Sequence, residues 1–168
     1  MINEFIIQNK KDLVTYDKKI VKKIKSLAKN NKKKRARLCM HLDLKDKTNE
    51  MIIALNKKSF IAPHIHPNNK SESYFVIEGS MKVYVFNKKG LVKKIINMGT
   101  YDSGKPFFYR MSKGFYHMPI STSNWCIYHE VYSGPFKKKI DVKYPIWSPS
   151  EDNPKEVKDF LKKIKFIK

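Results

Sequence analysis

Histidines and an acidic residue are concentrated in two short stretches of the chain, and together they could hold a metal ion. The first stretch contains His64 and His66, separated by one residue, and then Glu72. If His64 and His66 lie on one strand, their side chains point to the same face and both imidazoles can reach one ion. The second stretch runs from Gly114 to His117. Three histidines and one carboxylate with open coordination positions suit one divalent transition metal, such as Zn, Fe, Mn or Ni.

The elements that must position these residues are predicted to be short strands. From Arg37 the pattern has a period of two, because the apolar residues of 38–44 alternate with polar ones. Residues typical of turns separate further strand-like segments, which are 50–55, 60–66, 73–78, 81–86, 91–96, 107–111, 115–119 and 125–132. Many short strands at this spacing predict an all-β sandwich or barrel. No long helical pattern interrupts them, which argues against alternating strands and helices.

A helix is predicted near each end of the chain. In 17–29, Asp17 can cap a helix whose apolar residues form one stripe, which indicates docking on the main domain rather than membrane anchoring. In the last segment, Asn153 can cap a helix that begins at Pro154. The predicted organisation is an N-terminal extension with an amphipathic helix (1–34), a β-barrel (35–151) and a C-terminal helix (152–168).

The complete spacing resembles the two sequence motifs of the cupin superfamily. Here it is HxH, five residues, Glu72, six residues, Gly79, and later GxxH. The similarity extends to the WbuC family of cupin-fold metalloproteins over roughly residues 20–152. Its matching segments include 35–41, 59–67, 72–79, 130–136 and 147–151. This resemblance implies a small antiparallel jelly-roll (cupin) barrel with one metal in its mouth, held by His64, His66, Glu72 and His117. The second motif departs from the usual pattern, because Arg110 replaces an acid and Ser112 replaces a proline.

Six further residues are candidates for catalysis or substrate binding. His41 and Glu130 match positions of the family and are the candidate proton-transfer groups; His41 is equally interpretable as a hydrogen-bonded structural histidine. Because lysine is the default cation here, the rare Arg37 and Arg110 are candidates for a carboxylate or phosphate. Tyr74 and Tyr116 either line the cavity and stack on a ring of the substrate or fill the core. On its strand His129 faces away from Glu130, and the resemblance favours Glu130 as the inward residue.

The resemblance also implies a class of reaction. Members of the WbuC family are often found with genes for bacterial surface-polysaccharide and nucleotide-sugar synthesis. We therefore expect a small anionic substrate, such as a sugar or nucleotide-sugar in lipopolysaccharide synthesis, and metal-assisted isomerisation, epimerisation or hydrolysis. A non-haem Fe(II) dioxygenase and a non-enzymatic metal-dependent binding or sensor protein are the alternatives. The residues alone do not separate these three functions.

Charge and cysteine content limit the partners. The net charge of the 168-residue chain is +21, which would suit nucleic acid, yet only three of its 36 basic residues are arginine. The excess lysine is spread along the chain, so no nucleic-acid or membrane partner is predicted. The two cysteines, Cys39 and Cys126, are too few for a disulfide scaffold, and no apolar run could span a bilayer. A cytoplasmic protein is expected. A homodimer is also expected, with residues 5–7 as a strand that could be exchanged.

Overall fold

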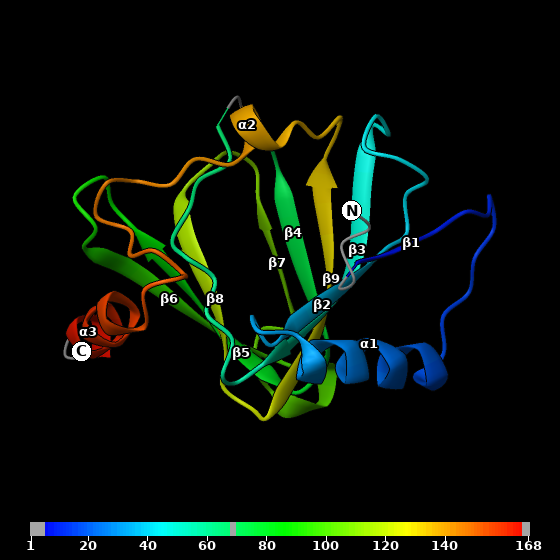
Figure 1. Cartoon of the computed structure of the whole chain (residues 1–168), viewed down its shortest axis with the longest axis horizontal. Helices are drawn as coiled ribbons and strands as arrows, with labels where there is room; N and C mark the ends of the chain where they lie inside the picture. The colour runs from blue at the N-terminus through cyan, green and yellow to red at the C-terminus, as the bar shows by residue number, and fades with distance from the viewer. Residues whose placement is uncertain (1–5, 68–69, 166–168) are drawn as a thin grey trace.

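The computed structural model describes residues 6–67 and 70–165, and its strands lie in two sheets that face each other (Figure 1). The larger sheet has the order β1-β2-β3-β9-β4-β7 and the smaller sheet the order β6-β5-β8. The strands are β1 (Ile6–Gln8), β2 (Arg35–Cys39), β3 (Thr48–Asn56), β4 (Glu72–Glu78), β5 (Ser80–Phe86), β6 (Val92–Gly99), β7 (Phe108–Met111), β8 (Tyr116–Ser121) and β9 (Trp125–Ser133). The helices are α1 (Lys18–Asn30), α2 (Lys138–Asp141) and α3 (Pro154–Lys165), with a 3-10 turn at Tyr101–Ser103.

This connectivity is that of a jelly roll. Strands β3, β9, β4 and β7 form four antiparallel neighbours, and β8, β5 and β6 form three more in the facing sheet. The segment 60–66 occupies the place beside β8, where His64 and His117 form an isolated antiparallel bridge. The predicted all-β jelly roll with a helix near each end is therefore confirmed. The sheets remain two separate layers rather than one closed barrel, and β1 adds a parallel pairing with β2.

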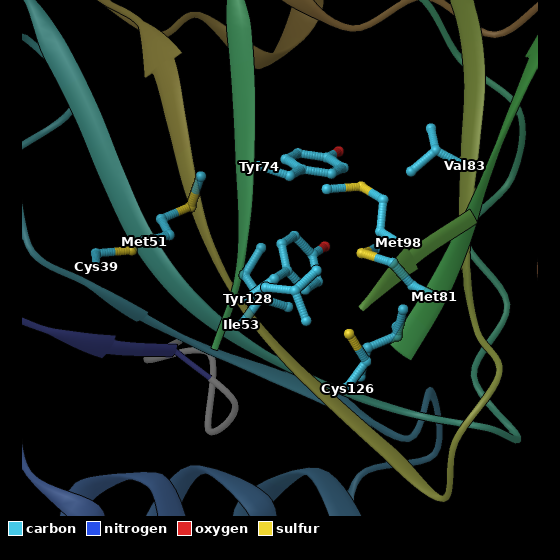
Figure 2. Packing of buried hydrophobic residues seen from close by; sticks show 11 residues of the cluster. Cys39, Met51, Ile53, Tyr74, Met81, Val83, Met98, Cys126 and Tyr128 are labelled. Atoms are coloured by element: carbon cyan, nitrogen blue, oxygen red, sulfur yellow. The ribbon is translucent and has the colours of Figure 1, made fainter. Parts of the chain in front are cut away.

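Apolar side chains fill the space between the two sheets. In Figure 2, Tyr74 of β4 and Met98 of β6 point toward each other from opposite sheets. Both cysteines are buried and free, and burial raises the pKa of the Cys126 thiol to about 12. Burial raises the pKa of the Cys39 thiol as well. The cysteines therefore belong to the packing of the core.

The outer face of the larger sheet is covered by α1, as its apolar stripe predicts. Asp17 caps the helix, since its carboxylate accepts hydrogen bonds from the N–H groups of Lys19 and Ile20. Ile24 is fully buried against the sheet residues Leu38 and Ile52. On the other side of the molecule, α3 and Trp147 pack on the outer face of the smaller sheet (Figure 1). Within the described residues, no helix is long and apolar enough to cross a membrane.

Two of the predicted strands are wrong in part. The strand expected over 37–44 ends at Cys39, and the chain then turns. Two aspartates cause the turn by accepting backbone hydrogen bonds, Asp46 from Leu42 and Asp43 from Lys45. The segment 60–66 makes only isolated bridges rather than a ladder. Pro63 has no N–H to donate, which is one reason why regular pairing fails there.

Candidate metal centre

Four side chains from three parts of the chain meet between the open ends of the two sheets. His64 and His66 come from the segment 60–66, Glu72 is the first residue of β4, and His117 is the second residue of β8. One ligand atom from each of them lies within 4.8 Å of every other. His117 and Glu72 are 0% and 1% exposed. The four predicted ligands are thus brought together in one buried cluster that could hold a metal ion, and we call these four side chains the metal group.

Backbone carbonyl groups orient all three imidazole rings. The Nδ1 atoms lie 2.9 Å from Ala62 O for His64, 2.7 Å from Asp141 O for His66, and 2.9 Å from Phe115 O for His117. A carbonyl oxygen can only accept, so each Nδ1 carries the proton and donates it. The Nε2 atoms are then the free ligand atoms, and this is the usual way in which a metal-binding histidine is fixed.

The Nε2 atoms converge on the carboxylate of Glu72. Nε2 of His66 lies 3.0 Å from Oε2, and Nε2 of His117 lies 3.3 Å from Oε1. Two lone pairs at this distance repel each other unless a proton or a cation lies between them. Nε2 of His117 is also buried without a hydrogen-bond partner among the described residues. A divalent cation would satisfy these atoms together, so the donor set fits a transition metal.

The electrostatics of the group are those of one negative charge among three imidazoles. Burial by itself would raise the pKa of Glu72, but His117 and His66 outweigh it and hold the pKa well below its usual range. Burial, together with the charges of His117 and His66, lowers the pKa of His64 well below its usual value. His117 differs, because Glu72 outweighs the effect of burial and raises its pKa. Glu72 is therefore the ionised ligand and His64 the neutral one.

Glu130 lies close to this group and points into the molecule. On β9 it pairs with Met51 on one side and Tyr74 on the other, both of which belong to the core between the sheets. His129 consequently faces the other way, as strand alternation predicts. Burial, followed by the negative charge of Glu72, raises the pKa of Glu130 to about 7. This value suits a group that takes up and releases protons near neutral pH.

His41 is separate from the four ligands. Its ring is buried, and Nδ1 contacts the backbone of Glu50, whose N–H donates to it at 3.1 Å. It lines a hollow of about 450 Å³ formed with Asn9, Lys11, Asp12, Leu13, Val14, Met40, Leu42, Asp46 and Glu50. Nε2 of His41 has no partner within the described ranges. This environment supports the structural interpretation of His41, and its proposed part in proton transfer stays a prediction.

Two predicted substrate-binding residues point away from the metal group. Because neighbouring residues of a strand face opposite ways, Tyr116 lies on the outer face of the smaller sheet when His117 points inward. There the Tyr116 ring packs edge-on against Trp147, with 5.7 Å between the ring centres. Arg110 is exposed on β7 and donates to Ser71 Oγ at 3.2 Å. The alternation of strands therefore corrects both assignments.

The other two candidates, Tyr74 and Arg37, differ in burial: Tyr74 is buried and Arg37 is exposed. Tyr74 is 2% exposed and packs against the rings of Tyr109 and Tyr128, so it fills the core rather than offering a face to a ligand. Arg37 is exposed on β2, and its guanidinium acts electrostatically on Glu130 and Tyr144. Of the four substrate-binding candidates, Arg37 is the one whose charge acts on Glu130.

Three groups that support the ligands are not among the residues predicted from the sequence. The hydroxyl of Tyr109 donates to Glu72 Oε1 at 2.7 Å and fixes the carboxylate. The ring of Tyr132 lies edge-on to His66, with 4.6 Å between the ring centres. The carbonyl of Asp141 accepts the proton of His66 Nδ1. Tyr109 and Tyr132 could have been found from strand alternation, since they share the inward face with Met111 and Glu130; a backbone carbonyl leaves no such signal.

Gly114 allows the two histidine segments to approach each other. A Cβ atom at this position would lie 2.0 Å from the carbonyl oxygen of His66 and 3.0 Å from the Ile65 side chain. The replacement Gly114→Ala should therefore displace the segment 60–66 and weaken metal binding by about tenfold. This is the lower end of the usual effect of substituting residues that support metal ligands. Isothermal titration of the metal-free protein with Zn²⁺ measures this. Lys113→Ala is the control, because Lys113 is the exposed residue directly before Gly114; equal affinity of all three proteins would contradict the prediction.

Comparison with known proteins gives a family of undescribed function and a set of distant structural relatives. Residues 16–98 match a family described as a domain of unknown function, DUF6016. No curated protein matches the chain. The chain is similar in structure to protein SO0799 from Shewanella oneidensis, with 14% identity, a TM-score of 0.49, and 60% of this chain and 63% of that chain covered. The chain thus spans 63% of the length of that relative.

Two further similar structures carry descriptive names. One is the cupin domain of Cnp3 from Schizosaccharomyces pombe, with 10% identity, a TM-score of 0.44, and 61% of this chain and 63% of that chain covered. The other is an uncharacterised protein with a double-stranded β-helix domain from Klebsiella pneumoniae, with 17% identity, a TM-score of 0.44, and 59% and 76% covered. Cupin and double-stranded β-helix proteins are therefore among the structures to which this chain is similar.

Proposed function

We propose that this protein binds one divalent transition metal through His64, His66, Glu72 and His117 and acts on a small anionic molecule, as the resemblance to the WbuC family implies. The observation that carries the proposal is the convergence of three Nε2 atoms, each turned inward by a carbonyl on its Nδ1, on one buried carboxylate. The metal, when bound, supplies a Lewis acid that polarises a carbonyl or hydroxyl oxygen of the ligand.

Glu130 is the candidate proton-transfer group of this reaction. Its carboxyl points toward the space between the sheets, and its pKa of about 7 lets it accept or release a proton near neutral pH. Such a group supports isomerisation, epimerisation or hydrolysis, each of which requires a proton to move. Which of the three occurs depends on the ligand, for which we propose a sugar or nucleotide-sugar of surface-polysaccharide synthesis.

Arg37 supports an anionic ligand. Its guanidinium has five N–H donors, and its one hydrogen-bonding contact within the described chain is with the sulfur of Met51, at 3.8 Å. It is therefore free to form a paired hydrogen bond with a carboxylate or phosphate. We propose such a small molecule as the partner, rather than nucleic acid or a membrane.

The cytoplasmic location and the homodimer also remain proposals. Light scattering at micromolar concentration tests the dimer.

A panel of nucleotide-sugars tests the function. With Zn²⁺-loaded protein, we expect a nucleotide-sugar to raise the thermal unfolding midpoint of the wild type and to be converted, and Arg37→Ala to lose the midpoint shift. Glu130→Gln should lower turnover by about 100-fold or more while the ligand still binds. Binding without turnover in the wild type would favour the sensor function. Oxygen consumption by the Fe(II)-loaded protein, but not by the Zn²⁺-loaded protein, would favour the dioxygenase.

A further inference from the structure

The chain between α2 and α3 runs along the segment that carries two of the metal ligands. We call residues 141–151 the strap; Figure 1 shows it in orange, leaving α2 and crossing the molecule toward α3. In the strap, the carbonyl of Asp141 accepts a hydrogen bond from His66 Nδ1 at 2.7 Å. Lys143 and Ile65 exchange a pair of backbone hydrogen bonds: the N–H of Ile65 donates to the carbonyl of Lys143 at 2.9 Å, and the N–H of Lys143 donates to the carbonyl of Ile65 at 3.0 Å. The segment 60–66 therefore makes its backbone contacts with β8 on one side and with the strap on the other.

The far end of the strap reaches the same segment through a side chain. Glu151, whose side chain is 14% exposed, accepts the backbone N–H of Ala62 at 3.0 Å through Oε1. Its other oxygen accepts hydrogen bonds from Arg35 and Lys33, both at 2.8 Å. Burial alone would raise the pKa of Glu151, but Arg35 outweighs it and lowers the pKa. Glu151 is thus an ionised acceptor held in place by two cations.

Ala62 connects Glu151 with the metal group. Its N–H donates to Glu151, while its carbonyl accepts the Nδ1 proton of His64 at 2.9 Å. The N–H and the carbonyl lie in neighbouring peptide planes that meet at the Ala62 Cα, and Pro63 restricts rotation between them, so a shift of the N–H away from Glu151 also moves the carbonyl that faces His64. The ring of Tyr144, also from the strap, lies 6.1 Å from the ring of His64, centre to centre. Two adjacent ligands are therefore oriented by one distant part of the chain.

We propose that Glu151 is a positioning residue of the metal centre: by holding Ala62 it fixes the ring of His64 so that Nε2 faces the ion. The inference rests on the proposed metal binding. It assigns to the strap a part in the site that goes beyond covering the segment 60–66. The expected consequence is a change in the affinity and in the ligand geometry of the ion, because a rotated imidazole no longer presents its lone pair along the ligand direction.

Titration of the metal-free protein with Co²⁺ tests the proposal, because the visible absorption of bound Co²⁺ reports the ligand geometry and its growth reports affinity. We expect Glu151→Ala to weaken Co²⁺ binding by about tenfold and to alter the spectrum, in line with residues that support metal ligands. Glu151→Gln keeps an oxygen that can accept from Ala62 but turns its NH2 group toward Arg35 and Lys33, so its loss of affinity should be smaller than that of Glu151→Ala. The matched control is the exposed neighbour in Asp152→Ala, which should behave as the wild type.

The outcomes separate this inference from the proposed function. If the wild type binds no Co²⁺, the metal site itself is wrong. If the wild type binds Co²⁺, and folded Glu151→Ala binds with the same affinity and spectrum, the role of Glu151 is wrong. Circular dichroism of the metal-free variants shows whether they fold. Should Glu151→Ala fail to fold, Glu151→Asp replaces it: its carboxylate keeps its charge but is one methylene too short to hold Ala62, so a spectrum unchanged from the wild type would overturn the proposal.

Discussion

Replacing His64 and His66 together by alanine should reduce the bound metal from about one equivalent to less than about a tenth. The two histidines supply half of the four ligands, and Glu72 and His117 would be left without the atoms that close the group. A carboxylate and a single imidazole do not hold a transition metal against dilution and washing. Mass spectrometry of protein purified without a tag and without chelators measures the metal per chain.

The matched control is His129→Ala, which removes a histidine that lies on β9 but faces away from the metal group. It should keep the metal content of the wild type. An unchanged metal content in the His64→Ala/His66→Ala protein would contradict the assignment of the ligands. So would a folded wild-type protein that holds no metal and takes up none of Zn, Fe, Mn or Ni on titration.

The metal-free wild type should lose stability relative to Glu130→Gln as the pH rises from about 5 to about 8. The pKa of Glu130 is about 7 in the folded protein against an ordinary value of 4.5, so the folded state holds the proton more tightly than the unfolded state. Ionisation at higher pH therefore costs the folded protein free energy. The loss is at most about 3 kcal/mol. Glutamine has the same shape and cannot ionise, so the variant lacks this dependence.

Urea unfolding of chelator-treated protein at several pH values between 5 and 8 measures the difference. The comparison with Glu78→Gln provides the control, because Glu78 is exposed in its ion pair with Lys25, and its loss should change stability by no more than about 1 kcal/mol over this range. A constant difference between the wild type and Glu130→Gln across this range would show that Glu130 ionises normally. It would also remove the basis for its role in proton transfer.

The ligand set could be read from the sequence because each ligand is defined by residue type and strand period. His64 and His66 share a face at a spacing of two, Glu72 directly precedes the predicted strand 73–78, and His117 lies within the predicted strand 115–119. The same period places Tyr116 outward when His117 points inward, so alternation and not residue type decides where this aromatic ring lies. Arg110 likewise faces away from its inward neighbour Met111.

The strand boundaries show where local pattern loses to side-chain chemistry. Alternation predicted a strand up to residue 44, but Asp43 and Asp46 accept backbone hydrogen bonds and turn the chain after Cys39. Pattern identifies which residues can be buried, whereas competition for backbone N–H groups decides where pairing stops. Leu42 and Leu44 are accordingly 44% and 53% exposed.

The sequence by itself determined the all-β class, the two terminal helices and the four residues of the metal group, since periodicity and ligand chemistry are local properties. The tertiary structure alone decided how those ligands are held. Carbonyls of Ala62, Phe115 and Asp141 orient the rings, and the last of these lies 75 residues from the histidine that it contacts. Every residue carries a carbonyl, so no residue type marks the three that face an imidazole. Ala62 and Phe115 each lie two residues before their own histidine, whereas only the folding of the strap across the sheets brings the Asp141 carbonyl to His66.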